Sequence, residues 1–211
     1  MGSALVARVV ECGCGIRKPV LIALVVAELV FAAAFLVIRF RPEFYVKAFD
    51  LDNERNLTAV FSAIQFAWIA GVIVSFLLVP GMIVEPLRRL ACAAVAGFLF
   101  LGIDEYTQVH EQLSGLLIPY AWIPRLKQDI GAWIPAYAVL AAILLFLFRR
   151  AILMAARLYP QPSKLFLAGL ALLFLGSVGC EIIAFEALAQ NSSDPSYPYV
   201  VVVEEFLEMS G

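Results

Sequence analysis

Residues 20–40 of the chain read VLIALVVAELVFAAAFLVIRF, and Glu28 and Arg39 are the only ionisable side chains among them. A helix needs about 20 predominantly apolar residues to cross the hydrocarbon core of a bilayer, so this stretch predicts a membrane-spanning helix. The whole chain has the same character: of its 211 residues, 63% are hydrophobic and 15% are charged, whereas soluble domains carry about a quarter charged residues. We therefore expect an all-α, polytopic membrane helix bundle.

The apolar blocks predict five full transmembrane helices and a sixth, complete or incomplete, in a single integral membrane domain. The expected spans in this domain, residues 1–211, are residues 20–40, 57–79, 87–111, 130–148, 164–190 and 199–211. The last one, YVVVVEEFLEMSG, would cover roughly 20 Å of a hydrocarbon core that is ~30 Å thick. Three explanations stay open: the helix ends inside the membrane, it ends against a membrane protein partner that covers it, or the sequence is cut before its natural end.

The distribution of Lys and Arg gives the orientation, because these residues favour short cytoplasmic loops. With the N-terminus inside, nine basic residues fall on the inner side and six on the outer side. The loop NSSDPSYPY (residues 191–199) then lies outside and has no basic residue. We expect a multi-pass protein with a cytoplasmic N-terminus and the lipid bilayer as its surroundings. The net charge of −2 leaves no basic surface for nucleic acid.

Acidic residues recur at one depth of the predicted bundle. Asp104, Glu105, His110 and Glu111 follow an uncharged run over residues 90–103, and His110 is the only histidine of the chain. At 1.5 Å per residue, the start of this group, Glu181 and the acids of the last span all fall in the outer part of the membrane, with Glu28 somewhat deeper. On one continuous helix, Asp104, Gln108 and Glu111 would share a stripe, with Glu105 pointing elsewhere.

The charge of these acidic residues must be neutralised inside the membrane. A charged side chain at the bilayer centre costs around 3 kcal/mol on insertion scales, and the apolar spans offer almost no Lys or Arg as partners. The acids therefore require either protons or metal ions. The candidate metal ligands are Asp104, His110, Glu111, Glu181, Glu204 and Glu208, with Glu28, Glu105 and Glu205 as additional candidates.

Three functions are compatible with this sequence, and two of them use the acidic residues. One imidazole with several carboxylates suits a divalent metal, Fe or Mn before Zn, in a membrane enzyme. The same acids could instead form the relay of a proton- or cation-coupled transporter or channel. An accessory subunit of a larger membrane complex is the third hypothesis, and it gives no reason for the acids. Glu28 also has a simpler interpretation, as a protonated carboxyl hydrogen-bonded across a helix contact.

The stretches LGIDEYTQVHEQL (residues 101–113) and VEEFLEM (residues 203–209), with the acidic fifth span, resemble a loose group of uncharacterised bacterial multi-spanning membrane proteins. That group carries an Asp-Glu-x5-His-Glu-like motif and a later Glu-Glu-x-x-Glu helix. The likeness covers about thirty residues. It implies a bacterial inner membrane and a shared acid–histidine site, and it implies no activity.

Overall fold

The computed structural model describes residues 2–51, 56–124, 126, 131–184 and 194–211, with side chains from Pro19 onward other than that of Pro42. The regular structure of these residues is entirely helical, without a strand. Five of the described helices are long and apolar enough to cross a membrane: Pro19–Phe40, Leu57–Leu78, Glu85–Thr107, Trp133–Leu158 and Pro160–Cys180. The prediction of an all-α chain with five full spans is confirmed, and these helices indicate a membrane protein.

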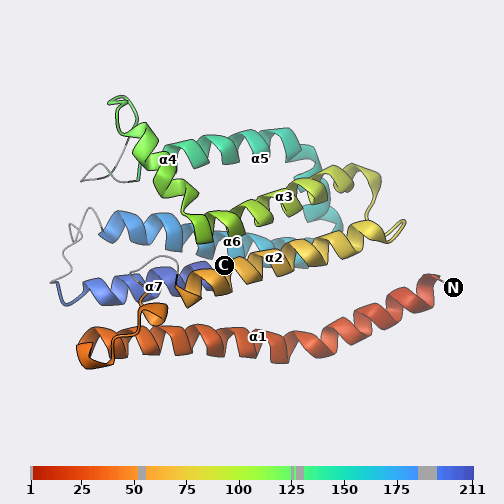
Figure 1. Cartoon of the computed structure of the whole chain (residues 1–211). Helices are drawn as coiled ribbons and strands as arrows, with labels where there is room; N and C mark the ends of the chain where they lie inside the picture. Colours follow the sequence, from red (N-terminus) through yellow and green to blue (C-terminus); the bar gives the residue numbers. More distant parts are fainter. Residues whose placement is uncertain (1, 52–55, 125, 127–130, 185–193) are drawn as a thin grey trace.

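The described elements follow one another along the chain in a fixed order. They are α1 (Gly2–Phe40), the 3₁₀ turns η1 (Pro42–Phe44) and η2 (Lys47–Phe49), α2 (Leu57–Leu78), α3 (Glu85–Thr107), α4 (Val109–Leu117), α5 (Trp133–Leu158), α6 (Pro160–Phe174), the π-helical segment η4 (Leu175–Cys180) and α7 (Tyr197–Ser210). The long helices lie roughly side by side, with α1 along one side of the bundle and α5 along the opposite side (Figure 1).

Local signals set several helix ends. The side chain of Asn56 accepts a hydrogen bond of 2.7 Å from the backbone N–H of Ala59 and so caps the start of α2. Proline occupies the first turn of α3, α6 and α7, where its missing N–H is not needed. Gly131 takes a positive φ of 71° just before α5, a conformation that glycine adopts without steric cost.

Some predicted boundaries differ from the observed ones. The third span is not continuous over residues 87–111 but breaks at Gln108. The fourth begins at Trp133 and extends to Leu158, beyond the predicted end at residue 148. The fifth begins at Pro160 and runs through η4, and residues 185–190 of its predicted range lie outside the described residues. The last helix, α7, has 14 residues, or roughly 21 Å at 1.5 Å per residue.

Much of the apolar surface of the bundle is exposed. Leu145, Phe146 and Leu147 of α5 are 58–65% exposed, and no described residue of α5 is buried. Soluble monomers rarely expose apolar patches of more than a few hundred Å², so this surface matches contact with lipid tails.

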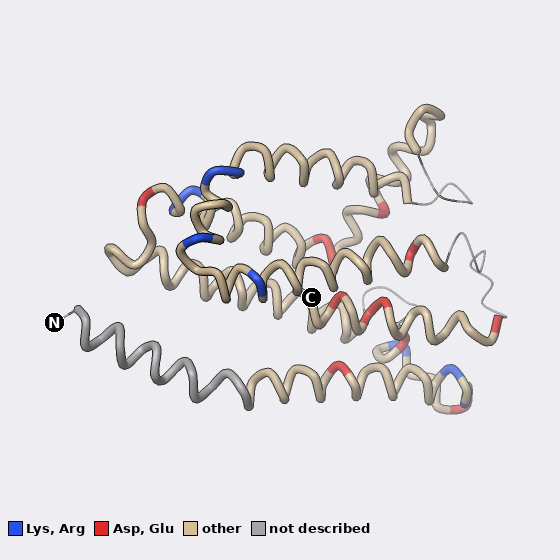
Figure 2. Tube along the Cα trace, turned by 180° about the vertical axis from the view of Figure 1, so that it is seen from behind, with Lys and Arg blue, Asp and Glu red and all other residues tan. Residues whose placement is uncertain are grey.

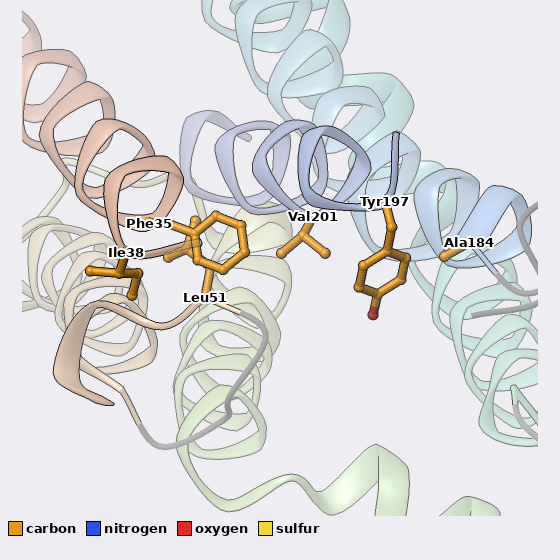
Figure 3. Packing of buried hydrophobic residues seen from close by; sticks show 6 residues of the cluster. All are labelled: Phe35, Ile38, Leu51, Ala184, Tyr197 and Val201. Atoms are coloured by element: carbon orange, nitrogen blue, oxygen red, sulfur yellow. The ribbon is translucent and has the colours of Figure 1, made fainter. Parts of the chain in front are cut away.

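A small buried cluster joins the end of the first helix, α1, to the last helix, α7. Its buried members are Phe35, Ile38, Leu51, Ala184, Tyr197 and Val201, contributed by α1, the loop after η2, the end of the fifth span and α7 (Figure 3). This packing fixes α7 against α1 at the end of the bundle where α1 terminates. From there α7 runs inward, and Gly211, which directly follows α7, contacts Gly169 and Leu173 in the second half of α6 (Figure 1).

Charged residues are segregated along the bundle. Lys and Arg gather at the end formed by the start of α3, the end of α5 and the start of α6 (Figure 2). Most Asp and Glu residues lie in the opposite half, with a further basic group beyond the end of α1 (Figure 2). Asp104 and Glu105 near the end of α3, Glu181 after η4 and the acids of α7 are thus placed away from the main basic end, whereas Glu85 in the first turn of α3 lies at that end.

Candidate functional site

The site begins where α3 breaks. Gln108 lies between α3 and α4 with φ 59° and ψ 44°, the left-handed conformation, which costs roughly 1–2 kcal/mol for a residue that has a Cβ. The predicted single helix over residues 87–111 is therefore wrong, and the predicted stripe of Asp104, Gln108 and Glu111 does not form on one helix face. Neither glycine nor proline occupies this position, so no local pattern in the sequence indicates the break.

The buried side chain of Asp104 stabilises the break between α3 and α4. Its Oδ1 accepts the backbone N–H of His110 at 2.8 Å, in the first turn of α4, and lies 3.2 Å from Nδ1 of the same residue. Its Oδ2 accepts the hydroxyl of Tyr137 on α5 at 3.1 Å. Asp104 is 7% exposed, and these contacts satisfy its buried carboxylate. Asp104 thus caps α4 and links α3 to α5.

Aromatic side chains of α5 enclose the same region. The indole ring of Trp133 packs edge-on against His110, with ring centres 5.3 Å apart, and against Tyr137 at 5.1 Å. Trp133 also donates its ring N–H to Oε1 of Glu181 at 3.3 Å. Trp133 therefore connects His110 to Glu181, which directly follows η4.

The π-helical segment η4 brings α7 close to the end of α6. A Cβ added to Gly176 would lie 2.7 Å from Cγ of Glu208 and 3.0 Å from the carbonyl oxygen of Glu204, so only glycine allows this approach. Single turns of π-helix inside α-helices occur frequently at functional sites. Here the segment seats the acidic part of α7.

Three glutamates meet next to this contact. One carboxylate oxygen each of Glu105 on α3 and of Glu205 and Glu208 on α7 lie within 4.8 Å of one another, and all three residues are half-buried. Metal–oxygen distances in proteins are about 2.0–2.6 Å, so two ligands of one metal ion are at most about 5 Å apart. The three carboxylates could hold one metal ion together after small side-chain adjustments.

Further titratable groups surround this trio, which we call the glutamate trio (Glu105, Glu205, Glu208). Glu208 lies within electrostatic range of Glu181 and Glu204 as well as of the other two members. Glu105 lies within range of His110 and Asp104. The charges of several acids thus act on one small volume, with the single histidine at its edge.

The structure brings together some predicted site residues and separates others. Glu105, Glu205 and Glu208 form the trio, Asp104 pairs with His110, and Glu204 is half-buried beside Gly176. Glu111 is exposed on α4 and accepts a 3.3 Å hydrogen bond from Gln108. Glu28 is apart from the others and accepts hydrogen bonds from Gln65 and Ser210.

Sequence reasoning missed two residues of this region. It treated residues 130–148 as a charge-free span and gave no role to Trp133 and Tyr137. Both carry a polar group on an apolar ring, and such rings find a hydrogen-bond partner when buried. Their spacing of four residues at the start of a span, on one helix face, was the available signal.

With this geometry in view, comparison with known proteins gives the family. A family model described as "Domain of unknown function (DUF8692)" matches residues 20–211. The chain belongs to this family. The matched stretch contains all five candidate spans from residue 20 on, α7 and every residue of the candidate site. No curated protein and no solved structure matches the chain.

Membership in DUF8692 does not confirm the expected motif. The resemblance noted above is to an Asp-Glu-x5-His-Glu-like pattern, whereas four residues, 106–109, separate Glu105 from His110 here. The left-handed turn at Gln108 lies inside this interval and returns the His110 ring to Asp104. In this chain the local contact between acid and histidine depends on that turn.

Proposed function

We propose that this DUF8692 protein is a multi-pass membrane enzyme in which the glutamate trio binds one divalent metal ion. The observation that carries the proposal is the convergence of three carboxylate oxygens, from α3 and α7, to within 4.8 Å. Three carboxylates at this separation repel one another strongly when all are ionised, and a divalent cation removes that repulsion.

The chemistry of the ligands limits which metal ions the site would bind. A set of carboxylate oxygens suits Mn²⁺ and other hard cations better than Zn²⁺, which favours sulfur and nitrogen ligands. His110 lies at the edge of the trio and could add a nitrogen ligand after rearrangement, which would also suit Fe²⁺. We therefore propose Mn²⁺ or Fe²⁺ before Zn²⁺.

The proposed setting is the outer half of a bacterial inner membrane, with the N-terminus in the cytoplasm. The clustering of Lys and Arg at the end where α3 starts and α5 ends supports this orientation, since basic residues favour the cytoplasmic side (Figure 2). The resemblance to bacterial multi-spanning proteins supports the choice of membrane.

A second function, proton transfer in a transporter, is favoured by one observation. The Asp104 carboxylate contacts both His110 and the hydroxyl of Tyr137, and Glu105 lies within electrostatic range of this pair. Groups with exchangeable protons that follow one another in this way are typical of relays in membrane proteins. In this alternative the trio holds protons in place of a metal ion.

Metal analysis of the purified protein tests the proposal. The protein is extracted in mild detergent from cells grown with manganese and iron, and the metal content per chain is measured by mass spectrometry. We expect Mn or Fe close to one ion per chain, and a loss of most of it in Glu205→Gln and Glu208→Gln. Glu85→Gln, an exposed position in the first turn of α3, is the control and keeps the metal. Equal metal content in all variants contradicts the proposal.

A further inference from the structure

Two buried helix faces meet away from the glutamate trio. On α1, Glu28, Ala32 and Phe35 follow one another at helical spacing and are 2%, 9% and 2% exposed. On α2, Thr58, Ser62 and Gln65 have the same spacing, and two of them are buried. The helices touch at the Phe31 and Phe61 rings, whose centres are 5.4 Å apart.

Glu28 lies at the inner end of these faces with uncharged partners. Its Oε1 is 3.4 Å from the side-chain nitrogen of Gln65, which donates to it, and its Oε2 accepts the hydroxyl of Ser210 at 2.9 Å. A carboxyl group at this depth is far cheaper to bury when it carries a proton.

Charged groups of the neighbouring elements face elsewhere. Residues 57–78 of α2 include no ionisable side chain. On α7, Glu208 is two residues before Ser210 and contacts Gly176, on a different side of the helix. The charges of η1 and η2, Glu43 and Lys47, lie beyond the end of α1. Protonation of Glu28 therefore depends on access to water more than on any neighbouring charge.

The face of α2 carries two buried hydroxyls for which the described residues provide no hydrogen-bond partner. Oγ1 of Thr58 and Oγ of Ser62 are buried and make no hydrogen bond within the described part of the chain. Thr58 is 0% exposed and Ser62 is 4% exposed. A buried polar group without a partner costs about 1–3 kcal/mol, and ordered water commonly satisfies such groups. Both hydroxyls lie between the outer end of α2 and Gln65, the partner of Glu28.

A cavity opens where α1 ends, beside the loop that leads into α2. It has a volume of about 330 Å³ and is lined by Phe35, Ile38, Arg39, Tyr45 and Asp50. Phe35 belongs to the same face of α1 as Glu28, and the carbonyl of Asp50 accepts a hydrogen bond of 2.9 Å from Asn56, two residues before Thr58. The cavity thus adjoins α1, the helix that carries Glu28, and one of its lining residues is hydrogen-bonded to the residue that caps the start of α2.

We propose that water enters from this cavity, follows the Thr58 and Ser62 hydroxyls along α2, and delivers protons to the carboxyl group of Glu28. This path is separate from the glutamate trio and does not depend on the metal. Its ligand is a proton carried by water, and Glu28 is the group that binds and releases it.

Thiol labelling of the full-length protein in lipid nanodiscs tests the water path. The four native cysteines are replaced by alanine, and Thr58→Cys and Ser62→Cys are compared with Ile64→Cys, which is 57% exposed on the lipid-facing side of α2. The probe is 2-aminoethyl methanethiosulfonate, which reacts with the thiolate and so reports water at the thiol. We expect both buried positions to react at least about tenfold faster than Ile64→Cys. Equal or slower reaction at both buried positions would overturn the path.

Infrared spectroscopy tests proton delivery to Glu28 itself. The stretching band of its protonated carboxyl group, assigned by its loss in Glu28→Gln, shifts when the proton is replaced by deuterium. We expect a fast shift in D₂O for the native protein and a shift at least about tenfold slower in a Thr58→Val, Ser62→Ala double variant. Both substitutions remove hydroxyls that have no hydrogen-bond partner among the described residues and nearly preserve volume, so we expect the double variant to fold. An unchanged rate, or no protonated band assignable to Glu28, contradicts the proposal.

Discussion

Asp104 has a different task from the one expected of a metal ligand. Its Oδ1 accepts the backbone N–H of His110 and so holds the first turn of α4 in place, and its Oδ2 accepts the hydroxyl of Tyr137. Glu105, the next residue, points toward α7 and joins the trio. Two adjacent acids are thus divided between a structural role at the helix break and the proposed metal site.

Tyr137→Phe should lower the stability of the protein. The substitution leaves the Oδ2 atom of buried Asp104 without its 3.1 Å donor but keeps the ring packing against Trp133 and Phe100. We expect a loss of about 1 kcal/mol, measured as a lower thermal unfolding temperature in detergent. Tyr106→Phe, on the exposed part of α3, is the matched control and should change little. An unfolding temperature that falls equally in both variants would remove the special role of the Asp104 contact.

At the scale of the elements, two irregular helices create the site: the break between α3 and α4, and the π-helical segment η4. In both, the main chain departs from the path of a regular α-helix, and both lie beside the acidic residues of the candidate site. In the sequence, only Gly176 points to η4, and no residue points to the break between α3 and α4.

Gln108 gives a direct test of the break. A glycine adopts φ of 59° without steric cost, so Gln108→Gly should be neutral or stabilising by up to about 1 kcal/mol relative to Gln108→Ala. A continuous helix predicts the opposite order, because glycine in a helix interior is about 1 kcal/mol worse than alanine. Thermal unfolding of the two variants distinguishes these outcomes.

Gly176→Ala tests the seat of α7 on η4. The added methyl would lie 2.7 Å from Cγ of Glu208, so α7 must shift and the trio must open. We expect a lower unfolding temperature and a clear loss of bound metal. Gly179→Ala is the control, because its Cβ would meet only Leu175, at 3.9 Å, and should leave both measurements unchanged. If Gly176→Ala behaves like Gly179→Ala, the close contact is not needed for the site.

At the scale of the whole molecule, hydropathy was enough to predict the five spans, because a bilayer demands long apolar helices. Counting residues along the spans also predicted that acids of α3 and α7 share one depth, and the proximity of Glu105 to Glu205 and Glu208 agrees with it. Which face of the third span meets α7 could not be predicted. On the assumed continuous helix, Glu105 pointed away from the stripe of Asp104 and Glu111 and appeared separate from the other acids. Which faces meet depends on long-range packing, which one sequence does not reveal.

Cysteine labelling tests the orientation of the bundle in the membrane. In a background without native cysteines, Ser196→Cys, just before α7, and Gln161→Cys, at the basic end near the start of α6, are both exposed. We expect a membrane-impermeant thiol reagent added to intact cells, with the outer membrane permeabilised, to label Ser196→Cys and not Gln161→Cys. The reverse pattern would invert the bundle and place the trio toward the cytoplasm.

The binding of metal by the glutamate trio is most directly tested by the change in unfolding temperature when Mn²⁺ is added to metal-free protein. A ligand at 100 times its dissociation constant stabilises the folded state by about 2.7 kcal/mol, so the unfolding temperature of the native protein should rise measurably. It should rise equally for Glu111→Gln, which lies outside the trio, and should not rise for Glu208→Gln. No rise for the native protein, together with a metal-free Glu208→Gln that is more stable than the native chain, would contradict the metal site and favour protons on the same acids.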